Sequence, residues 1–214
     1  MTSQAVRDPI KDQLLTPKNA ALIIIDYQPI QVSSILSMDQ ELLVQNIVRV
    51  ARTAGVYGLP VVVSTVNVKT GRNKPMIPEL QEVLPGIEPL DRTSINAWED
   101  VEFLAAVKAT GRKKLLMTAL WTEACLAFPT LDALREGYEV YPVVDAVGGT
   151  SLEAHRAALE RVVQAGAKPV SWVQVICELQ RDWKREETVK AIADILFDPK
   201  VPFVAAERRA AVPV

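Results

Sequence analysis

The sequence LLMTALWTEACLAF, residues 115–128, joins an apolar strand to a helix through one short polar turn. Leu115–Leu120 is predicted to be a strand, and Thr122 suits the N-cap position of the helix that follows. Such a turn lies at the carboxyl edge of a parallel sheet, which is where open α/β sheets bind ligands. Cys125 would then lie near the free backbone N–H groups of a helix start, which favour the thiolate and lower the thiol pKa. The alternative for this segment alone is a buried, unreactive cysteine, because free cysteine is among the most buried residue types.

The length and composition of the chain bound its class. Residues 1–214 are predicted to form a single domain, with a core at about 19–197 and irregular tails at both ends. The formal net charge of −2 provides no broad basic field to hold nucleic acid or an anionic membrane. Residues 1–20 contain several charged side chains and so lack the apolar run of a signal peptide. No apolar stretch approaches the roughly 20 residues that span a bilayer. We therefore expect a soluble, cytoplasmic protein.

The cysteines and the single histidine limit the chemistry. Cys125 and Cys177 are far apart in the sequence and make neither a disulfide framework nor a metal cluster. Because His155 is the only histidine, a multi-histidine metal site is impossible, and we expect neither a metal nor a cofactor. His155 is expected to make a structural hydrogen bond. A nucleophile would then have to find a carboxylate or a lysine as its base.

Strand and helix patterns alternate along the chain. Apolar or β-branched runs predict strands at Ala20–Ile25, Val61–Val63, Leu115–Leu120 and Tyr138–Val144. Two further short strands are expected at Leu90–Arg92 and Lys168–Trp172. Helical spacing predicts helices at Gln40–Tyr57, Glu99–Gly111, Leu126–Glu136, Thr150–Gly166, Glu178–Lys190 and Ala191–Phe197. Residues 69–89, rich in proline, are predicted to be an irregular loop that serves as a lid or a subunit contact. The alternation gives βαβ units, hence a parallel sheet of about six strands with helices on both faces.

Two charged residues stand at the ends of predicted strands. Asp26 comes directly after the apolar run Ala20–Ile25, at the carboxyl edge of the sheet. Arg92 ends the short strand Leu90–Arg92, where a fixed cation can pair with Asp26. The alternatives are a loop or capping aspartate and a solvated surface arginine. No glycine follows the first strand and no Walker sequence occurs, which disfavours nucleotide binding of either standard kind.

Three separated motifs together resemble the isochorismatase-like cysteine hydrolases. They are Asp26–Tyr27–Gln28 after a strand, the cation Arg92, and Thr122–Glu123–Ala124–Cys125 after another strand. Further matching segments are Asp132–Ala133, Gly137–Tyr138 and Val144–Asp145–Ala146. The segments SINAW (94–98), CEL (177–179) and RDW (181–183) resemble the YcaC-like branch in particular. The similarity covers roughly residues 19–183, and the joint pattern is specific where each motif alone is weak.

The resemblance implies a Rossmann-like, three-layer αβα sandwich and a catalytic triad. In that pattern Cys125 is the nucleophile, Asp26 is the general base and Arg92 is the cation of the triad. The resemblance also implies a cis peptide bond between Leu120 and Trp121, with the backbone N–H groups of Trp121 and Cys125 facing the oxyanion. The substrate pocket implied by the same motifs includes Gln28, Asn96, Trp98 and Thr122.

Two positions depart from the family pattern. Arg92 stands where the family usually has lysine, and an arginine can hold Asp26 bidentately but cannot donate its proton. Pro129 replaces a small hydroxylic residue, and it predicts a kink or a helix start there because an interior proline costs about 3 kcal/mol.

Nicotinamidases of this superfamily carry a histidine-built metal site, which a chain with one histidine cannot rebuild. Isochorismate-specific members lack the cysteine, so Cys125 favours hydrolysis of a C–N bond.

The resulting hypothesis is a metal-free cysteine hydrolase that acts on a small amide, carbamoyl or related compound through a covalent cysteine intermediate. One alternative keeps the fold but not the chemistry: a catalytically degraded member with a binding or assembly role. Another, a flavodoxin-like nucleotide or redox module, is disfavoured by the absent phosphate loop. The apolar content of 49% and the resemblance imply a homo-oligomer, often an octamer in this branch, with residues 69–89 and the C-terminal segment at the contacts.

Overall fold

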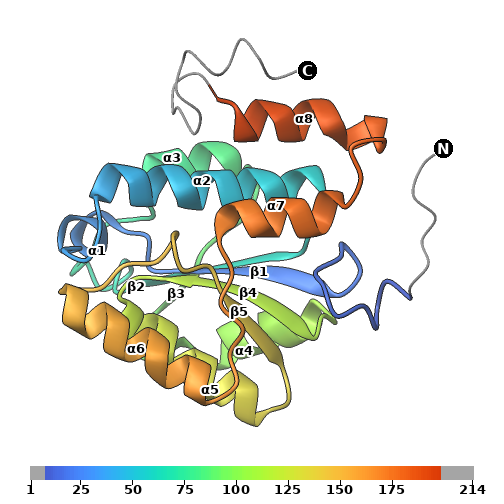
Figure 1. Ribbon diagram of the computed structural model, residues 1–214. Coiled ribbons are helices and arrows are strands. Elements are labelled where there is room, and N and C mark those ends of the chain that lie inside the picture. The colour runs from blue at the N-terminus through green and yellow to red at the C-terminus, as the bar shows by residue number, and fades with distance from the viewer. Residues whose placement is uncertain (1–7, 199–214) are drawn as a thin grey trace.

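The computed structural model describes residues 8–198, and its centre is a parallel sheet (Figure 1). Within these residues the sheet has five strands in the order β3–β2–β1–β4–β5, and every neighbouring pair is parallel. The strands are β1 (Ala20–Ile25), β2 (Val61–Val66), β3 (Leu90–Arg92), β4 (Lys114–Ala119) and β5 (Glu139–Pro142). All residues of β1 and β4 are buried, because helices cover both faces of these central strands.

Helices form a layer on each face of the sheet, which confirms the predicted αβα sandwich. One layer contains α2, α3, α7 and α8, and the other contains α4, α5 and α6 (Figure 1). The helices are α1 (Pro29–Ser33), α2 (Gln40–Val56), α3 (Pro78–Val83), α4 (Val101–Ala109), α5 (Ala127–Arg135), α6 (Leu152–Gln164), α7 (Trp172–Gln180) and α8 (Glu186–Leu196). A 3-10 turn, η1 (Ala97–Glu99), precedes α4, and a π-helical turn, η2 (Thr122–Leu126), precedes α5. Among residues 8–198, no helix combines the length and the apolar content that crossing a membrane requires.

The alternation of side chains along β1 divides the core in two. Ile24 belongs to the apolar cluster under α2 and α7, whereas Ile23 and Ile25 belong to the cluster under α4 and α5. The carboxyl ends of the central strands are level, since Ile25 is in register with both Ser64 and Ala119. The segments that follow β1, β2 and β4 therefore begin side by side at one edge of the sheet.

The sixth predicted strand, Lys168–Trp172, is reduced to a single bridge between Val143 and Val170. The segment does lie beside β5, because the N–H of Lys168 donates to the Val140 carbonyl at 2.9 Å. Trp172 already begins α7, so the extended stretch is too short to form a regular strand. For this reason the described sheet has five strands rather than about six.

Two further boundary predictions are wrong. The predicted helix Glu178–Lys190 is interrupted, because α7 ends at Gln180, Arg181 has a positive φ of 62°, and α8 begins only at Glu186. Residues 69–89 are not wholly irregular, because they contain the short helix α3, which starts with Pro78 at its first position. The predicted irregular tail 198–214 lies, beyond residue 198, outside the described residues, and so does any contact assigned to it.

Candidate active site

Asp26 directly follows β1 and is fully buried at the carboxyl edge of the sheet. Its backbone φ is +64°, in the left-handed region that residues other than glycine rarely adopt. Its N–H donates to the Ser64 carbonyl at 3.0 Å, so the residue is still anchored to β2 while the chain turns away from the sheet. Backbone strain of this kind persists where the surrounding structure requires a side chain in one place.

Arg92 ends β3 and reaches Asp26 across β2. Its Nη1 and Nη2 donate to Oδ1 and Oδ2 of Asp26 at 2.7 and 2.8 Å, so the ion pair is bidentate. Both terminal nitrogens make further bonds: Nη1 donates to Ser64 Oγ at 3.0 Å and to the Thr65 carbonyl at 3.2 Å, and Nη2 donates to the Ile95 carbonyl at 3.3 Å, whereas the buried Nε meets no acceptor among the described residues. The side chains of Arg92 and Asp26 are 1% and 0% exposed. The expected pairing is therefore present, and Arg92 is not a solvated surface arginine.

The charge of Arg92 is maintained despite its burial. Burial works to lower the pKa of the guanidinium, but the hydrogen bonds and the negative charge of Asp26 outweigh burial and raise that pKa. Ser64 also contributes to this arrangement, and it is a functional residue that the sequence analysis missed. The available signal was a serine within the apolar strand VVVSTV, because a hydroxyl that is buried in this way needs a polar partner.

Cys125 lies in η2, the π-helical turn Thr122–Leu126, which we call the cysteine turn. The N–H of Leu126 donates to the Trp121 carbonyl five residues earlier at 3.2 Å, and the expected cis peptide bond Leu120–Trp121 is present. Single π-helical turns of this type occur frequently at functional sites. The regular helix α5 starts at Ala127, so Pro129 lies in its first turn, where the missing N–H is tolerated.

The Cys125 thiol is nearly buried, with 8% of the residue exposed, and both members of the ion pair lie close enough to influence its pKa. Burial raises the pKa of the thiol to about 12, and the charge of Asp26 and a hydrogen bond between the two side chains contribute to this. The charge of Arg92 and a hydrogen bond from the Trp121 N–H act in the opposite direction. The prediction of a lowered thiol pKa is therefore wrong, because burial and a neighbouring carboxylate outweigh the backbone N–H.

Gln28 is a predicted pocket residue, and both polar atoms of its side chain form hydrogen bonds with backbone groups. Its Nε2 donates to the carbonyls of Val66 at 3.1 Å and Lys74 at 2.6 Å, and its Oε1 accepts from the Val66 N–H at 2.9 Å. The residue is fully buried. Gln28 thus joins the end of β2 to the loop that precedes α3, close in sequence to Asp26.

Asn96 and Trp98, two further pocket candidates, are likewise bonded to protein groups. Asn96 caps η1 by accepting from the Trp98 N–H at 3.1 Å, and its Nδ2 donates to Asp132 at 2.7 Å. The Trp98 indole donates to Glu136 at 2.9 Å and packs in the same apolar cluster as Cys125. Both residues therefore hold the segment after β3 against α5.

Thr122, the last pocket candidate, begins the cysteine turn and is fully buried. Its hydroxyl oxygen lies 2.9 Å from His155 Nδ1, and its N–H donates to the Gly148 carbonyl at 2.9 Å. This contact is the structural hydrogen bond expected for His155. Burial lowers the pKa of that histidine, and the charge of Glu123 works in the other direction.

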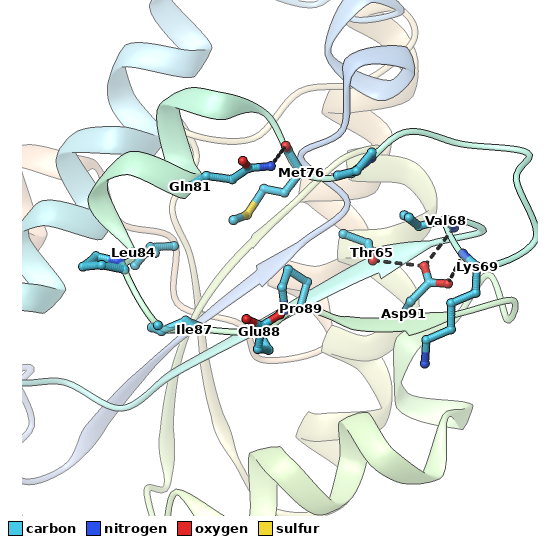
Figure 2. A pocket seen from close by; sticks show the side chains of 13 residues that line it. Thr65, Val68, Lys69, Met76, Gln81, Leu84, Ile87, Glu88, Pro89 and Asp91 are labelled. Carbon is cyan, nitrogen blue, oxygen red and sulfur yellow. Dashed lines mark hydrogen bonds between the residues drawn. The ribbon is translucent and has the colours of Figure 1, made fainter.

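A cavity of about 450 Å³ lies close to this site in sequence but on the other face of the sheet (Figure 2). Asp91 borders the cavity and accepts hydrogen bonds from Thr65 Oγ1 and from the N–H groups of Val68 and Lys69 at 3.0, 3.0 and 2.8 Å. Because successive strand residues point to opposite faces, Asp91 faces this cavity whereas Arg92 faces Asp26. The cavity is therefore separate from the Asp26–Arg92–Cys125 group.

The structure thus brings together Asp26, Arg92, Cys125 and the Trp121 backbone, and it places the other candidates around them as bonded supports. Within residues 8–198, no three His, Cys, Asp or Glu side chains gather as a metal site would require.

The chain is similar to proteins of one known family. A family model described as the isochorismatase domain matches residues 20–174. The chain is 35% identical over 189 residues to an Escherichia coli K12 protein named "Probable hydrolase YcaC", and the match covers 88% of this chain and 89% of that protein.

Two solved structures are similar over most of the chain. YcaC from Pseudomonas aeruginosa, with hexane-2,5-diol and covalent acrylamide, has a TM-score of 0.81 and 36% identity, covering 86% of this chain and 90% of that one. The YcaC gene product of E. coli, described as an octameric hydrolase of unknown specificity, has a TM-score of 0.81 and 34% identity, with the same coverage of 86% and 90%.

The buried ion pair predicts a large effect of removing one partner. Arg92→Met leaves the Asp26 carboxylate buried and unpaired, so we expect the free energy of unfolding to fall by about 3–5 kcal/mol. The matched control is Lys108→Met, which breaks a pair with Glu136 of 3.6 Å in which the lysine side chain is 55% exposed. That change should cost less than about 1 kcal/mol. Urea unfolding measures both, and equal losses would contradict the role given to burial.

Proposed function

The chain belongs to the isochorismatase family, in its YcaC-like branch, and from that premise we propose that it is a cysteine-dependent hydrolase of small amides, carbamoyl compounds or related C–N substrates. The observation that carries the proposal is that the Cys125 thiol lies beside the buried Asp26–Arg92 ion pair at the carboxyl edge of the sheet, close enough for both charges to act on the thiol pKa. A thiol and a carboxylate within hydrogen-bonding reach are the nucleophile and the base that covalent hydrolysis needs.

The relatives support the same chemistry. The P. aeruginosa protein is described with covalent acrylamide, and the E. coli protein is described as a hydrolase. Acrylamide is a small amide with an electrophilic carbon, so it resembles the proposed substrates and reacts readily with thiols. It is therefore a suitable probe for Cys125.

In the first half of the proposed reaction Cys125 is acylated. The sulfur attacks the carbonyl carbon while its proton passes to an oxygen of Asp26, which forms a C–S bond and an oxyanion. Collapse of the oxyanion breaks the C–N bond, and the proton held by Asp26 passes to the leaving nitrogen. Arg92 keeps the carboxylate oriented throughout, but it is not a proton donor because its guanidinium stays charged.

In the second half water releases the product. Water attacks the thioester carbon, Asp26 accepts a proton from it, and the C–S bond breaks as the sulfur is protonated again. The products are a carboxylic acid and an amine or ammonia. The Trp121 N–H, which faces the sulfur at rest, and the Cys125 N–H are the donors that we assign to the oxyanion in both halves.

We assign the four remaining pocket candidates to the walls of the proposed pocket. The side chains of Gln28, Asn96 and Thr122 are each bonded to other protein groups, and the Trp98 indole is 4% exposed. We therefore assign them to fixing the segments that surround the substrate rather than to bonding it directly.

A catalytically degraded protein with a binding or assembly role is the second candidate. This candidate is favoured by the near-complete burial of Cys125 and by the raised pKa of its thiol. A cysteine with both properties and no working base is unreactive. The two candidates differ in one measurable property, the reaction of Cys125 with small electrophilic amides.

We also propose a homo-oligomer, because the E. coli relative is octameric. Large apolar side chains that a subunit contact would cover include Leu36, Ile95 and Val101, which are 74%, 65% and 81% exposed. Light scattering of the purified chain should give a multiple of the 23.6 kDa subunit mass, and a monomeric mass would remove this part of the proposal.

The nucleophile is tested by mass spectrometry of the intact protein during a screen of amides, carbamoyl compounds and nitriles. We expect wild type to gain an adduct that maps to Cys125 and to release product, and Cys125→Ala to do neither. Cys177→Ser is the control, because Cys177 is exposed and lies outside the site. Turnover by Cys125→Ala, or the lack of any adduct and turnover in wild type, would favour the second candidate.

The pH dependence tests Asp26 as the base. Because the pKa of the Cys125 thiol is raised to about 12, the thiol stays protonated at pH 7–9, and reaction through free thiolate would accelerate about tenfold per pH unit. Proton transfer to Asp26 instead predicts alkylation by acrylamide at a nearly constant rate over this range. Asp26→Asn removes two of the causes that raise the thiol pKa, so its alkylation should become steeply pH-dependent. Exposed Cys177, mapped on its own peptide, serves as the internal reference.

A further inference from the structure

The cysteine turn is bonded to residues 148–150, which we call the glycine segment. Leu120 forms a single parallel bridge with Gly148, and the Thr122 N–H donates to the Gly148 carbonyl at 2.9 Å. The Glu123 carboxylate accepts from the Thr150 N–H at 3.0 Å and from the Thr150 hydroxyl at 2.6 Å. The segment that follows β5 therefore holds the start of the turn that carries the sulfur.

The glycine segment also holds the chain that follows Asp26 and α1. The Gly149 carbonyl accepts from the Leu36 N–H at 3.1 Å, and the Gly149 N–H donates to Ser37 Oγ at 2.9 Å. The Trp121 indole donates to Ser34 Oγ at 2.6 Å, which ties the cysteine turn to the same stretch. The segments that follow β1, β4 and β5 thus form one bonded unit.

The approach of these segments leaves no room for a side chain on the two glycines. A Cβ atom on Gly148 would lie 2.6 Å from Ile35 Cγ2. A Cβ atom on Gly149 would lie 2.7 Å from Glu123 Oε2 and 3.0 Å from His155 Cβ. Glycine fits here because a Cβ would displace the Ile35 side chain at position 148, and the Glu123 carboxylate and His155 at position 149.

Glu123 is bonded through one oxygen only. Its Oε1 takes both hydrogen bonds from Thr150, whereas Oε2 is buried and meets no donor among the residues that the structure describes. A buried acceptor without a donor costs free energy, so stability alone does not account for a carboxylate here. What the arrangement does achieve is to fix the backbone two residues before Cys125.

We propose that Glu123 is a positioning residue that, through Thr150, keeps the Cys125 sulfur in contact with Asp26. The inference rests on the proposed function, in which that contact provides the proton transfer. The π-helical winding is rare in proteins and appears mostly as single turns, so we assign its persistence here to the contacts that Glu123 makes outside the turn. Without the Glu123–Thr150 bonds the turn relaxes toward α-helical winding, which rotates the sulfur away from the carboxylate.

The experiment measures the rate of Cys125 alkylation by acrylamide from pH 7 to 9 in the full-length protein, with Cys177 as the internal reference. This range avoids titration of His155, whose pKa burial lowers. Glu123→Ala should react at least about tenfold more slowly at pH 7, since small displacements of a reacting group cost up to about 100-fold, and its rate should become steeply pH-dependent. Glu123→Gln should recover most of the loss, because its carbonyl oxygen still accepts from Thr150.

Two further variants keep the test decisive. Thr150→Val removes the hydroxyl donor and leaves the N–H, so it should fall between wild type and Glu123→Ala, and it is the variant to use if Glu123→Ala does not fold. Glu160→Ala, an exposed glutamate on α6, is the matched control and should follow wild type.

The outcomes separate this inference from the proposed function. A pH-independent rate in wild type that persists in Glu123→Ala and in Thr150→Val would overturn the positioning role alone. A Glu123→Gln protein as impaired as Glu123→Ala would overturn it as well, because the charge rather than the Thr150 bonds would then matter. A steep pH dependence already in wild type would overturn the proposed base and the positioning role together.

Discussion

The bidentate ion pair between Arg92 and Asp26 is the interaction on which the rest of the site depends. Both side chains are almost completely buried, and each charge costs several kcal/mol to remove from water. Only good geometry with additional hydrogen bonds repays that cost, and here Ser64 and the Thr65 carbonyl supply those bonds from β2. Three adjacent strands are thereby fixed in register, because a slip of one residue would turn Arg92 to the opposite face and leave Asp26 unpaired.

The same pair determines the state of the thiol. Reactive cysteines commonly have a lowered thiol pKa, because nearby cations or the N–H groups at a helix start stabilise the thiolate. In this protein Arg92 and the Trp121 N–H act in that direction, but burial and Asp26 outweigh them, and the thiol remains protonated. A protonated thiol with a carboxylate beside it needs no free thiolate, because the base removes the proton as the C–S bond forms. The Arg92–Asp26 pair and the thiol therefore act as one unit.

Local sequence patterns were sufficient for the elements that a buried parallel sheet dictates. Ala20–Ile25 is a strand with the predicted bounds, since an uninterrupted apolar run is a signal carried within the segment. Leu90–Arg92 also has the predicted bounds, although its sequence Leu-Asp-Arg contains no residue that favours strands strongly. The resemblance located Asp26, Arg92 and Cys125, which the structure brings together at one edge of the sheet. The break at Arg181 was not predictable, because a positive φ at a charged residue leaves no compositional signal.

The rest of the site depended on contacts between segments distant in sequence. Thr150 and Glu123 are 27 residues apart, and nothing in either local pattern indicates that a carboxylate will meet a hydroxyl there. Two adjacent glycines, at 148 and 149, carry no local signal of their role, although each has a neighbour that would lie within 3 Å of a hypothetical Cβ. A glycine pair after the last strand of a parallel sheet therefore has two readings, a flexible turn or a close crossing of chains. The side chains of the facing segments decide between them, and in this protein the crossing joins the chain that follows the base to the turn that carries the sulfur.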